Sequence, residues 1–193
     1  MPESADCIRS TMTSVAGAYH EMRRDPLLGG SNNAPTYGHL TRVLAAMGLD
    51  RDAVFVDLGC GFGMPSILAA TTYGCRCFGV DYLPEMVARA RAAARRAGVD
   101  HLCQFDLLDL TDLDPAWLTQ RGATHVYSFD AVITPAAWNT MRDAVCRAGI
   151  PCVASCFGLA YWPGAAAVAK IRIKMVSSGE GRTMHVMHPP NHL

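Results

Sequence analysis

The sequence predicts an α/β protein with a doubly wound, mostly parallel sheet of seven strands that ends in an antiparallel hairpin. Short apolar runs alternate with amphipathic stretches through the middle of the chain, which is the pattern of repeated strand–helix–strand units. Four such units in succession require right-handed crossovers and therefore a parallel sheet. Near the C-terminal end, two further strand-like runs follow the fifth strand without a helix between them, which indicates a hairpin.

The composition limits the classes of function. The 193 residues are half hydrophobic and carry a formal net charge of zero, so one domain with a sizeable core is expected. The neutral balance gives no global case for binding nucleic acid, and any such contact requires a local patch. The eight cysteines form no paired C-x-x-C set, so a zinc site is not expected. Several of them lie in apolar runs that are predicted to be buried strands, which suggests a reducing, intracellular setting. The sequence shows no secretory leader pattern and no apolar run long enough to span a membrane, so no association with a membrane is expected.

The first fifty residues are predicted to hold two helices. Apolar residues recur at three- and four-residue spacing through 8–22, which predicts an amphipathic helix. A stretch rich in glycine, asparagine and proline over 23–35 predicts a loop. Thr36 is a candidate N-cap for a second helix that Gly48 ends. The apolar face of this second helix is formed by Leu40, Val43, Leu44 and Met47.

The remaining elements follow from apolar runs and from their start and stop residues. The predicted parallel strands cover 53–56, 75–80, 101–105, 124–127 and 150–155, and the hairpin covers 168–176 and 183–187. The predicted helices between them cover 64–70, 84–97, 115–120 and 134–148, and each has proline as its first or second residue. Glycine directly follows the second and the fourth. In the first hairpin strand Lys170, Arg172 and Lys174 alternate with apolar residues, which predicts a half-exposed strand.

The segment 53–63 carries the clearest functional motif. Asp57 ends the first parallel strand, and Gly59, Gly61 and Gly63 follow at alternate positions. A strand that runs into a glycine turn and then into a helix brings backbone N–H groups close to a ligand. The dinucleotide fingerprint G-x-G-x-x-G would need its third glycine at position 64, where methionine stands. The alternative is a glycine turn that only joins a core strand to a helix.

Four aspartates follow at the carboxyl ends of successive predicted strands: Asp57, Asp81, Asp106 and Asp130. Doubly wound sheets bind their ligands beyond these strand ends, so the four acids predict one site. Asp81 lies about twenty residues after the glycines, at the position where such folds place a carboxylate on ribose hydroxyls. Asp106 has an equally good alternative, which is to cap a turn in a loop.

An acid before G-x-G-x-G, together with five parallel strands and a hairpin, resembles the class I S-adenosylmethionine (SAM) methyltransferases, which have a Rossmann-like fold. The resemblance implies SAM as the cofactor and S-adenosylhomocysteine (SAH) as its product. It implies that Asp57 supports the aminoacid end of SAM and that the turn of Gly59, Gly61 and Gly63 passes beneath the carboxylate and ribose. It also implies that Asp106 contacts the adenine amine and that Leu107 lies against the ring.

Four features resemble more closely the disruptor-of-telomeric-silencing (Dot-one-like) family of non-SET histone-lysine methyltransferases. Tyr37-Gly38-His39 resembles the family segment Tyr-Gly-Glu, and Asp57-Leu58-Gly59-Cys60-Gly61-Phe62-Gly63 resembles Asp-Leu-Gly-Ser-Gly-x-Gly. Val126-Tyr127-Ser128-Phe129-Asp130, followed by Pro135, stands in the place of the family's Val-Asn-Asn…Pro. The fourth feature is the absence of a helix between the fifth strand and the hairpin. His39 replaces the family's glutamate, and Ser128 or Asp130 stands where the family often has asparagine. Met184-His185 stands where an aromatic residue of the lysine channel is expected.

This resemblance implies a chromatin regulator in the nucleus that methylates a core lysine of histone three on the nucleosome. It makes Tyr37, Ser128 and Asp130 the candidate catalytic residues, and it places Tyr37 and Gly38 over the cofactor. Phe129, Tyr161 and Trp162 are candidate walls of a lysine channel, whereas Trp138 is as well explained as a core residue. The single domain then divides into a cofactor-covering part over 1–50, a SAM-binding core over 51–156, and a substrate loop with the hairpin over 157–193.

The partner implied is a histone or a nucleosome. Lys170, Arg172 and Lys174 are candidates to meet DNA phosphates or an acidic histone surface, and the alternative is a solvated sheet face. Two other functions stay open. One is a methyltransferase of small molecules or other proteins, and the other is a SAM-binding module without catalysis.

Overall fold

The computed structural model describes residues 37–174 and 181–189. Several predictions lie outside these residues: the helix over 8–22, the loop over 23–35, the N-cap at Thr36, and the end of the first hairpin strand with most of the hairpin turn. For the described part of the chain, no helix is both long enough and apolar enough to cross a membrane.

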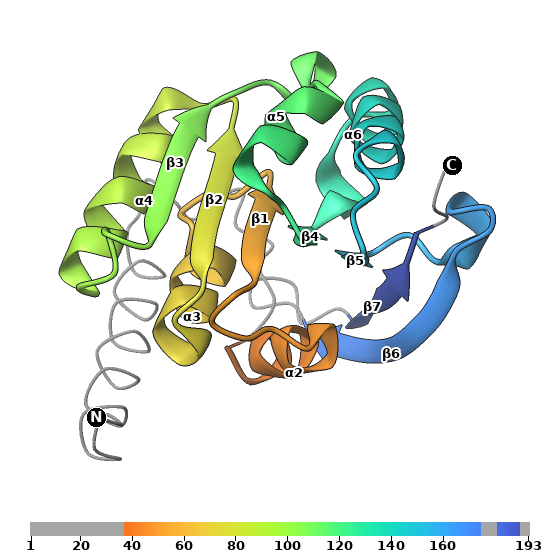
Figure 1. The fold of residues 1–193 in the computed structure, drawn as a ribbon, viewed down its shortest axis with the longest axis horizontal. Helices are drawn as coiled ribbons and strands as arrows, with labels where there is room; N and C mark the ends of the chain where they lie inside the picture. The colour runs from red at the N-terminus through yellow and green to blue at the C-terminus, as the bar shows by residue number, and fades with distance from the viewer. Residues whose placement is uncertain (1–36, 175–180, 190–193) are drawn as a thin grey trace.

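Seven strands form one sheet in the order β3-β2-β1-β4-β5-β7-β6 (Figure 1). They are β1 (Val54–Leu58), β2 (Arg76–Asp81), β3 (Cys103–Leu107), β4 (His125–Ser128), β5 (Cys152–Ser155), β6 (Ala166–Lys174) and β7 (Gly181–His188). The first five strands are parallel, and β7 runs antiparallel to both β5 and β6. The predicted fold class is therefore confirmed. The strand order reverses beside β1, which is where ligands of such sheets bind.

Helices cover both faces of the sheet and bury their apolar residues against it. One face carries α2 (Tyr37–Met47), α3 (Met64–Tyr73) and α4 (Pro84–Arg96), and the other carries α5 (Pro115–Arg121) and α6 (Pro135–Arg147). The described residues also form three short 3₁₀ helices: η2 (Leu110–Asp112), η3 (Asp130–Val132) and η4 (Leu159–Tyr161). Local caps fix the helix starts. The Asp114 side chain accepts from the Ala116 amide, and the Thr134 side chain accepts from the Ala137 amide.

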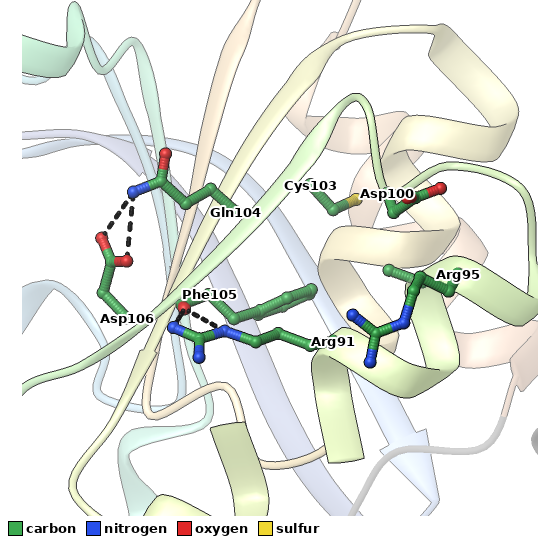
Figure 2. Close-up of a pocket in the computed structure, with 8 residues that line it drawn as sticks. Arg91, Arg95, Asp100, Cys103, Gln104, Phe105 and Asp106 are labelled. Atoms are coloured by element: carbon green, nitrogen blue, oxygen red, sulfur yellow. Dashed lines mark hydrogen bonds between the residues drawn. The ribbon is translucent and has the colours of Figure 1, made fainter. Parts of the chain in front are cut away.

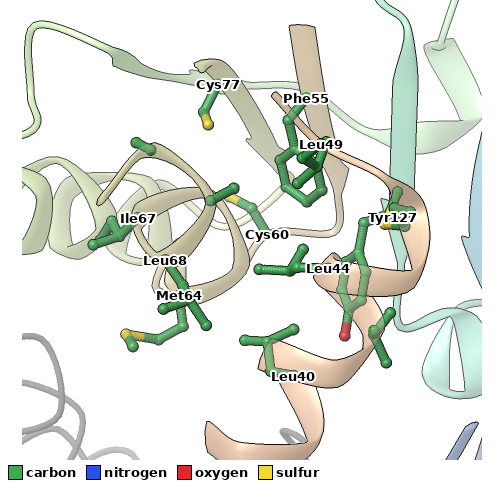
Figure 3. Close-up of a cluster of buried hydrophobic side chains, with 14 of the residues drawn as sticks. Leu40, Leu44, Leu49, Phe55, Cys60, Met64, Ile67, Leu68, Cys77 and Tyr127 are labelled. Atoms are coloured by element: carbon green, nitrogen blue, oxygen red, sulfur yellow. The ribbon is translucent and has the colours of Figure 1, made fainter. Parts of the chain in front are cut away.

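The sheet separates two hydrophobic cores. The larger core lies under α2, α3 and α4, and part of it is shown in Figure 3, where Leu44, Phe55 and Tyr127 lie close together. The smaller core lies under α5 and α6. Cys75, Cys77 and Cys152 are buried free thiols in or beside strands, as predicted, and there they act as small apolar side chains.

The connection from β5 to β6 contains only η4, so the predicted absence of an α-helix there is confirmed. The β6–β7 pair continues past the end of β5. Ser155 ends β5 and pairs with His185, while β6 runs on to Lys174, which pairs with Gly181. The predicted half-exposed strand is also confirmed, since Ile171 and Ile173 are buried while Lys170, Arg172 and Lys174, which alternate with them, are exposed.

Candidate functional site

The glycine turn after β1 is tied to the end of β2. Gly59 and Cys60 donate from their amides to the Val80 carbonyl at 3.0 and 2.8 Å, and the Gly61 amide donates to Asp81 Oδ2 at 2.9 Å. Gly59, Gly61 and Gly63 have φ values of 81°, 51° and 74°, a region that glycine adopts without steric cost. The turn and the carboxylate of β2 therefore form one unit at the carboxyl edge of the sheet.

The three glycines of the turn face different surroundings. A Cβ added at Gly59 or Gly61 would meet no described atom within 4 Å, so the turn borders open space at both positions. A Cβ added at Gly63 would lie 2.5 Å from the buried Phe105 ring and 3.1 Å from Ala90 Cβ. Gly59 and Gly61 thus leave room for a ligand, whereas Gly63 is needed for packing between α3, α4 and β3.

Asp81 ends β2 and is nearly buried at the floor of this edge. Besides the bond from Gly61 to Oδ2, the Leu83 amide donates to Asp81 Oδ1 at 3.0 Å. These two bonds hold the plane of the carboxylate, and each oxygen keeps a second acceptor site. The carboxylate that the sequence predicts as the ribose acceptor therefore keeps an unused lone pair on each oxygen.

Asp57 lies fully buried in β1 beside Asp81. Burial raises the pKa of Asp57 well above its usual range, the nearby Asp81 charge raises it further, and Ser66 opposes the rise. Asp57 Oδ2 is buried with no hydrogen-bond donor among the described residues. A buried acceptor of this kind, next to a second carboxylate, fits a cationic donor such as the ammonium of an amino acid.

Replacing Asp57 with asparagine should change how stability depends on pH. Because the folded-state pKa of Asp57 is raised, its contribution to stability is fully present below the ordinary aspartate pKa of about 3.9. That contribution is lost as the pH rises through the raised value. Asp57→Asn should therefore gain stability relative to the wild type as the pH rises. Urea unfolding at several pH values measures this, and a pH-independent difference would contradict the assignment.

Two large apolar side chains stand exposed beside Asp81. Tyr82 is 64% exposed and Leu107 is 57% exposed. Leu107 pairs with Asp81 across β2 and β3, and the next amide, of Leu108, donates to the Asp81 carbonyl at 3.0 Å. Sequence reasoning found Leu107 but missed Tyr82, whose signal is its position directly after the acid of β2. The two side chains suit the faces of a flat aromatic ring.

Asp106 points to the other face of the sheet. Its Oδ2 pairs with Arg121 Nη2 at 3.0 Å, and Gln104 Nε2 donates to both carboxylate oxygens. The Arg121 guanidinium in turn lies over the Trp117 ring at 3.7 Å. The structure therefore places Asp106 in an ion pair under α5, away from the open edge beside Leu107.

Ser128 and Asp130, the candidate catalytic residues on β4 and η3, are buried and hydrogen-bonded. Ser128 Oγ donates to the Leu58 carbonyl at 2.8 Å. Asp130 accepts from Trp138 Nε1 at 3.1 Å, from the Cys156 amide at 2.7 Å, and from Ser155 Oγ. Burial raises the pKa of Asp130, and these donors oppose the rise. Asp130 thus joins β4, β5 and α6 and does not line an open pocket.

The predicted channel residues separate into two groups. Phe129 and Tyr37 are partly buried against the larger core, and burial raises the pKa of Tyr37, whose hydroxyl has no hydrogen-bond partner among the described residues. Gly38, beside Tyr37, is exposed at the start of α2. Trp162 is buried in the smaller core near Trp138, whereas Tyr161 is 52% exposed. Of the three predicted channel walls, Phe129 and Tyr161 therefore have surface to offer a substrate and Trp162 does not, while Tyr37 is also partly exposed.

A groove of about 460 Å³ lies elsewhere, between α4 and the edge strand β3 (Figure 2). Arg91 and Arg95 of α4 line it with Cys103 and Gln104 of β3, and Arg91 Nε donates to the Phe105 carbonyl at 2.9 Å. The groove does not include the glycine turn or Asp81. Among the described residues, no three potential ligands are placed to hold a metal ion.

Comparison with known proteins agrees with this geometry. A family model described as a methyltransferase domain matches residues 49–156. An RNA methyltransferase from Salinibacter ruber, solved with SAH, is 27% identical with a TM-score of 0.65, over 83% of this chain and 96% of that chain. A SAM-dependent methyltransferase from Geobacter sulfurreducens, also solved with SAH, is 14% identical with a TM-score of 0.62, over 94% of this chain and 98% of that chain.

A curated relative is norajmaline N-methyltransferase from Rauvolfia serpentina, which is 34% identical over 58 residues. This match covers 30% of this chain and 20% of the length of the relative. None of these matches specifically supports the Dot-one-like resemblance. The family match covers more than half of the chain, and the sheet order and the glycine turn agree with it. The chain therefore belongs to the methyltransferase domain family and is a class I SAM-dependent methyltransferase domain.

Proposed function

We propose that this chain transfers the methyl group of SAM to a nucleophile of an RNA substrate held at the carboxyl edge of the sheet. SAM binding at this edge is supported by the hydrogen bond from the Gly61 amide to Asp81 and by the exposed side chains of Tyr82 and Leu107 beside it. RNA is favoured because the Salinibacter ruber relative is named an RNA methyltransferase and matches over nearly its whole chain.

The residues at the edge fit the parts of SAM. Asp81 would accept the ribose hydroxyls, and Tyr82 and Leu107 would flank the adenine ring. Asp57 Oδ2, which lacks a donor, would attract the ammonium of the aminoacid end, and Gly59 and Gly61 would admit its approach. When bound, SAM supplies a methyl group activated by its sulfonium charge.

The chain's contribution to the transfer is orientation and the exclusion of water. Ser128 and Asp130 are buried and engaged, so neither is placed to take a proton from the substrate. Tyr37 and Phe129 present apolar surface that would exclude water at the methyl end. An amine acceptor must be neutral to have a lone pair, and a dry site favours the neutral form.

Replacing Asp81 with alanine is expected to weaken SAH binding by roughly 10- to 150-fold, equivalent to 1.5–3 kcal/mol for hydrogen bonds to a charged group. Isothermal calorimetry measures this, and a thermal melt checks that the variant stays folded. Asp52→Ala is the matched control, because Asp52 is an exposed aspartate before β1, at the opposite edge of the sheet. Equal SAH affinity in Asp81→Ala and the wild type would remove the ribose assignment.

A histone lysine is the second candidate substrate. The observation that favours it is the β5–β6 connection without an α-helix, which is one of the features behind the Dot-one-like resemblance. A nucleosome partner and a nuclear location belong to this candidate alone. Under either candidate, we propose one domain in which 51–156 holds SAM and 157–193 contacts the substrate.

Transfer of a radiolabelled methyl group from SAM tests the proposal. The acceptors are total RNA, recombinant nucleosomes, free histones and a small-molecule extract. We expect label in RNA. Label in histone three would instead support the lysine candidate, and label in the extract alone would indicate a small-molecule enzyme. SAH binding without label in any acceptor would support the SAM-binding module without catalysis.

A further inference from the structure

On the face of the β6–β7 pair opposite α2, the β5–β6 connection supplies no α-helix, and Met187 is buried there in the smaller core. Ile171 and Ile173 point to the larger core. The residues between and beside them therefore point to the opposite face, where they are exposed: Lys170, Arg172 and Lys174. The side chains beside this row on β7 are small or polar, namely His185, Thr183 and Gly181, each in register with one cation.

This row begins level with the carboxyl edge and extends beyond it. Ser155, the last residue of β5, pairs with His185, and His185 pairs with Lys170. Because a strand rises about 3.3 Å per residue, Arg172 and Lys174 lie roughly 7 and 13 Å further along. The long β6 forms the outer edge of the sheet (Figure 1). The row is therefore on the substrate side of the molecule.

The positive charge of this row is not neutralised by the described residues. The ion pairs among the described residues join Arg121 to Asp106 and Arg142 to Asp143, and neither pair includes a cation of β6. The pKa of His185 is lowered, first by its burial and then by the nearby Lys170 charge, and Asp130 opposes the fall. In a chain of zero net charge, this face is a local cationic patch.

An exposed aromatic ring adjoins the patch. Gly158 lies against His185, since a Cβ added at Gly158 would stand 3.0 Å from His185 Cε1. Tyr161 is tied to the same glycine, because its amide donates to the Gly158 carbonyl at 2.9 Å. The Tyr161 ring packs on Phe157 with centroids 4.8 Å apart and on Trp138 at 5.9 Å. Tyr161 is thus supported from below while about half of its surface stays exposed.

We propose that Lys170, Arg172, Lys174 and Tyr161 form a docking surface for a single-stranded segment of the RNA substrate. Regularly spaced cations suit a repeating polyanion better than a single carboxylate, and an exposed ring suits stacking on a base. An unpaired segment is favoured, because a base must leave its duplex before an enzyme can act on it, and an unpaired base is already free. This inference rests on the proposed function and identifies where its substrate binds.

The test measures binding of a fluorescein-labelled 20-nucleotide oligouridylate to the full chain by fluorescence anisotropy across a salt series. Three phosphate contacts on a single strand give a slope of log K against log salt of about −2. Lys170→Gln/Arg172→Gln/Lys174→Gln should bring this slope close to zero. Tyr161→Ala should weaken binding by roughly 5- to 150-fold at fixed salt, and Tyr161→Phe should keep it, because stacking needs only the ring.

Arg76→Gln/Arg95→Gln/Arg96→Gln is the matched control, since it removes three exposed positive charges from β2 and α4. It should leave the slope and the affinity unchanged. SAH calorimetry on every variant separates the two proposals, because the docking surface lies outside the cofactor residues and its loss should not alter SAH affinity. A wild-type slope in the β6 triple variant, or tighter binding of duplex DNA or nucleosomes than of the RNA strand, would overturn the docking surface.

Discussion

Asp130→Ala is expected to lower the free energy of unfolding by about 3–5 kcal/mol, because it leaves buried donors without an acceptor. The donors are Trp138 Nε1 from α6, Ser155 Oγ from the end of β5, and the amide of Cys156, the residue after β5. Losing the carboxylate would therefore loosen the join between these elements. Urea unfolding followed by circular dichroism measures the change.

The control for this variant keeps the shape of the side chain. Asp130→Asn retains one oxygen acceptor but turns an amide donor toward the other donors, so an intermediate loss of stability is expected. Asp130→Ala with wild-type stability and wild-type SAH affinity, but without methyl transfer, would contradict the structural role. It would instead support the direct part in catalysis that the sequence suggested for Asp130.

Gly63→Ala is expected to lower the free energy of unfolding by about 3 kcal/mol or more. Two effects add at this position. The backbone has a φ of 74°, which costs a residue with a Cβ of order 1–3 kcal/mol. The new methyl would also lie 2.5 Å from the buried Phe105 ring, so the ring would have to shift and its packing would be disturbed. Chemical unfolding of the purified variant measures the sum.

Gly98→Ala separates the two effects. Gly98 has a φ of 70°, but a Cβ there would meet no described atom within 4 Å. This variant should show the backbone cost alone and so lose clearly less stability than Gly63→Ala. Equal losses in the two variants would mean that the Phe105 contact adds nothing and that the packing account of Gly63 is wrong.

Local patterns in the sequence were enough to predict the sheet and the glycine turn. Alternation along β6 placed Ile171 inward and Lys170 outward, and the run into Gly59 placed a turn at the carboxyl end of β1. These features depend on residues close together in the chain, where periodicity and glycine chemistry decide the structure. The position of Asp81 beside the turn also followed, because neighbouring parallel strands end at the same edge.

The directions of individual side chains could not be predicted in the same way. A shift of one residue at a strand end turns a side chain to the opposite face, and this decides that Asp106 points to Arg121 while Leu107 points to the open edge. Likewise, Trp162 and Tyr161 are neighbours in a loop rich in aromatic residues, yet only Trp162 is buried. Its burial depends in part on α6, which supplies the Trp138 ring that it packs against.

Hydrogen exchange of the full chain with and without saturating SAH tests the central claim, which is that SAM binds at the carboxyl edge of this sheet. The account predicts slower amide exchange in the glycine turn around Gly61, after Asp81, and at Leu107 and Leu108. It predicts no change along the groove formed by α4 and the start of β3 (Figure 2). Unchanged exchange at the glycine turn and at the end of β2, or protection of the groove alone, would contradict it.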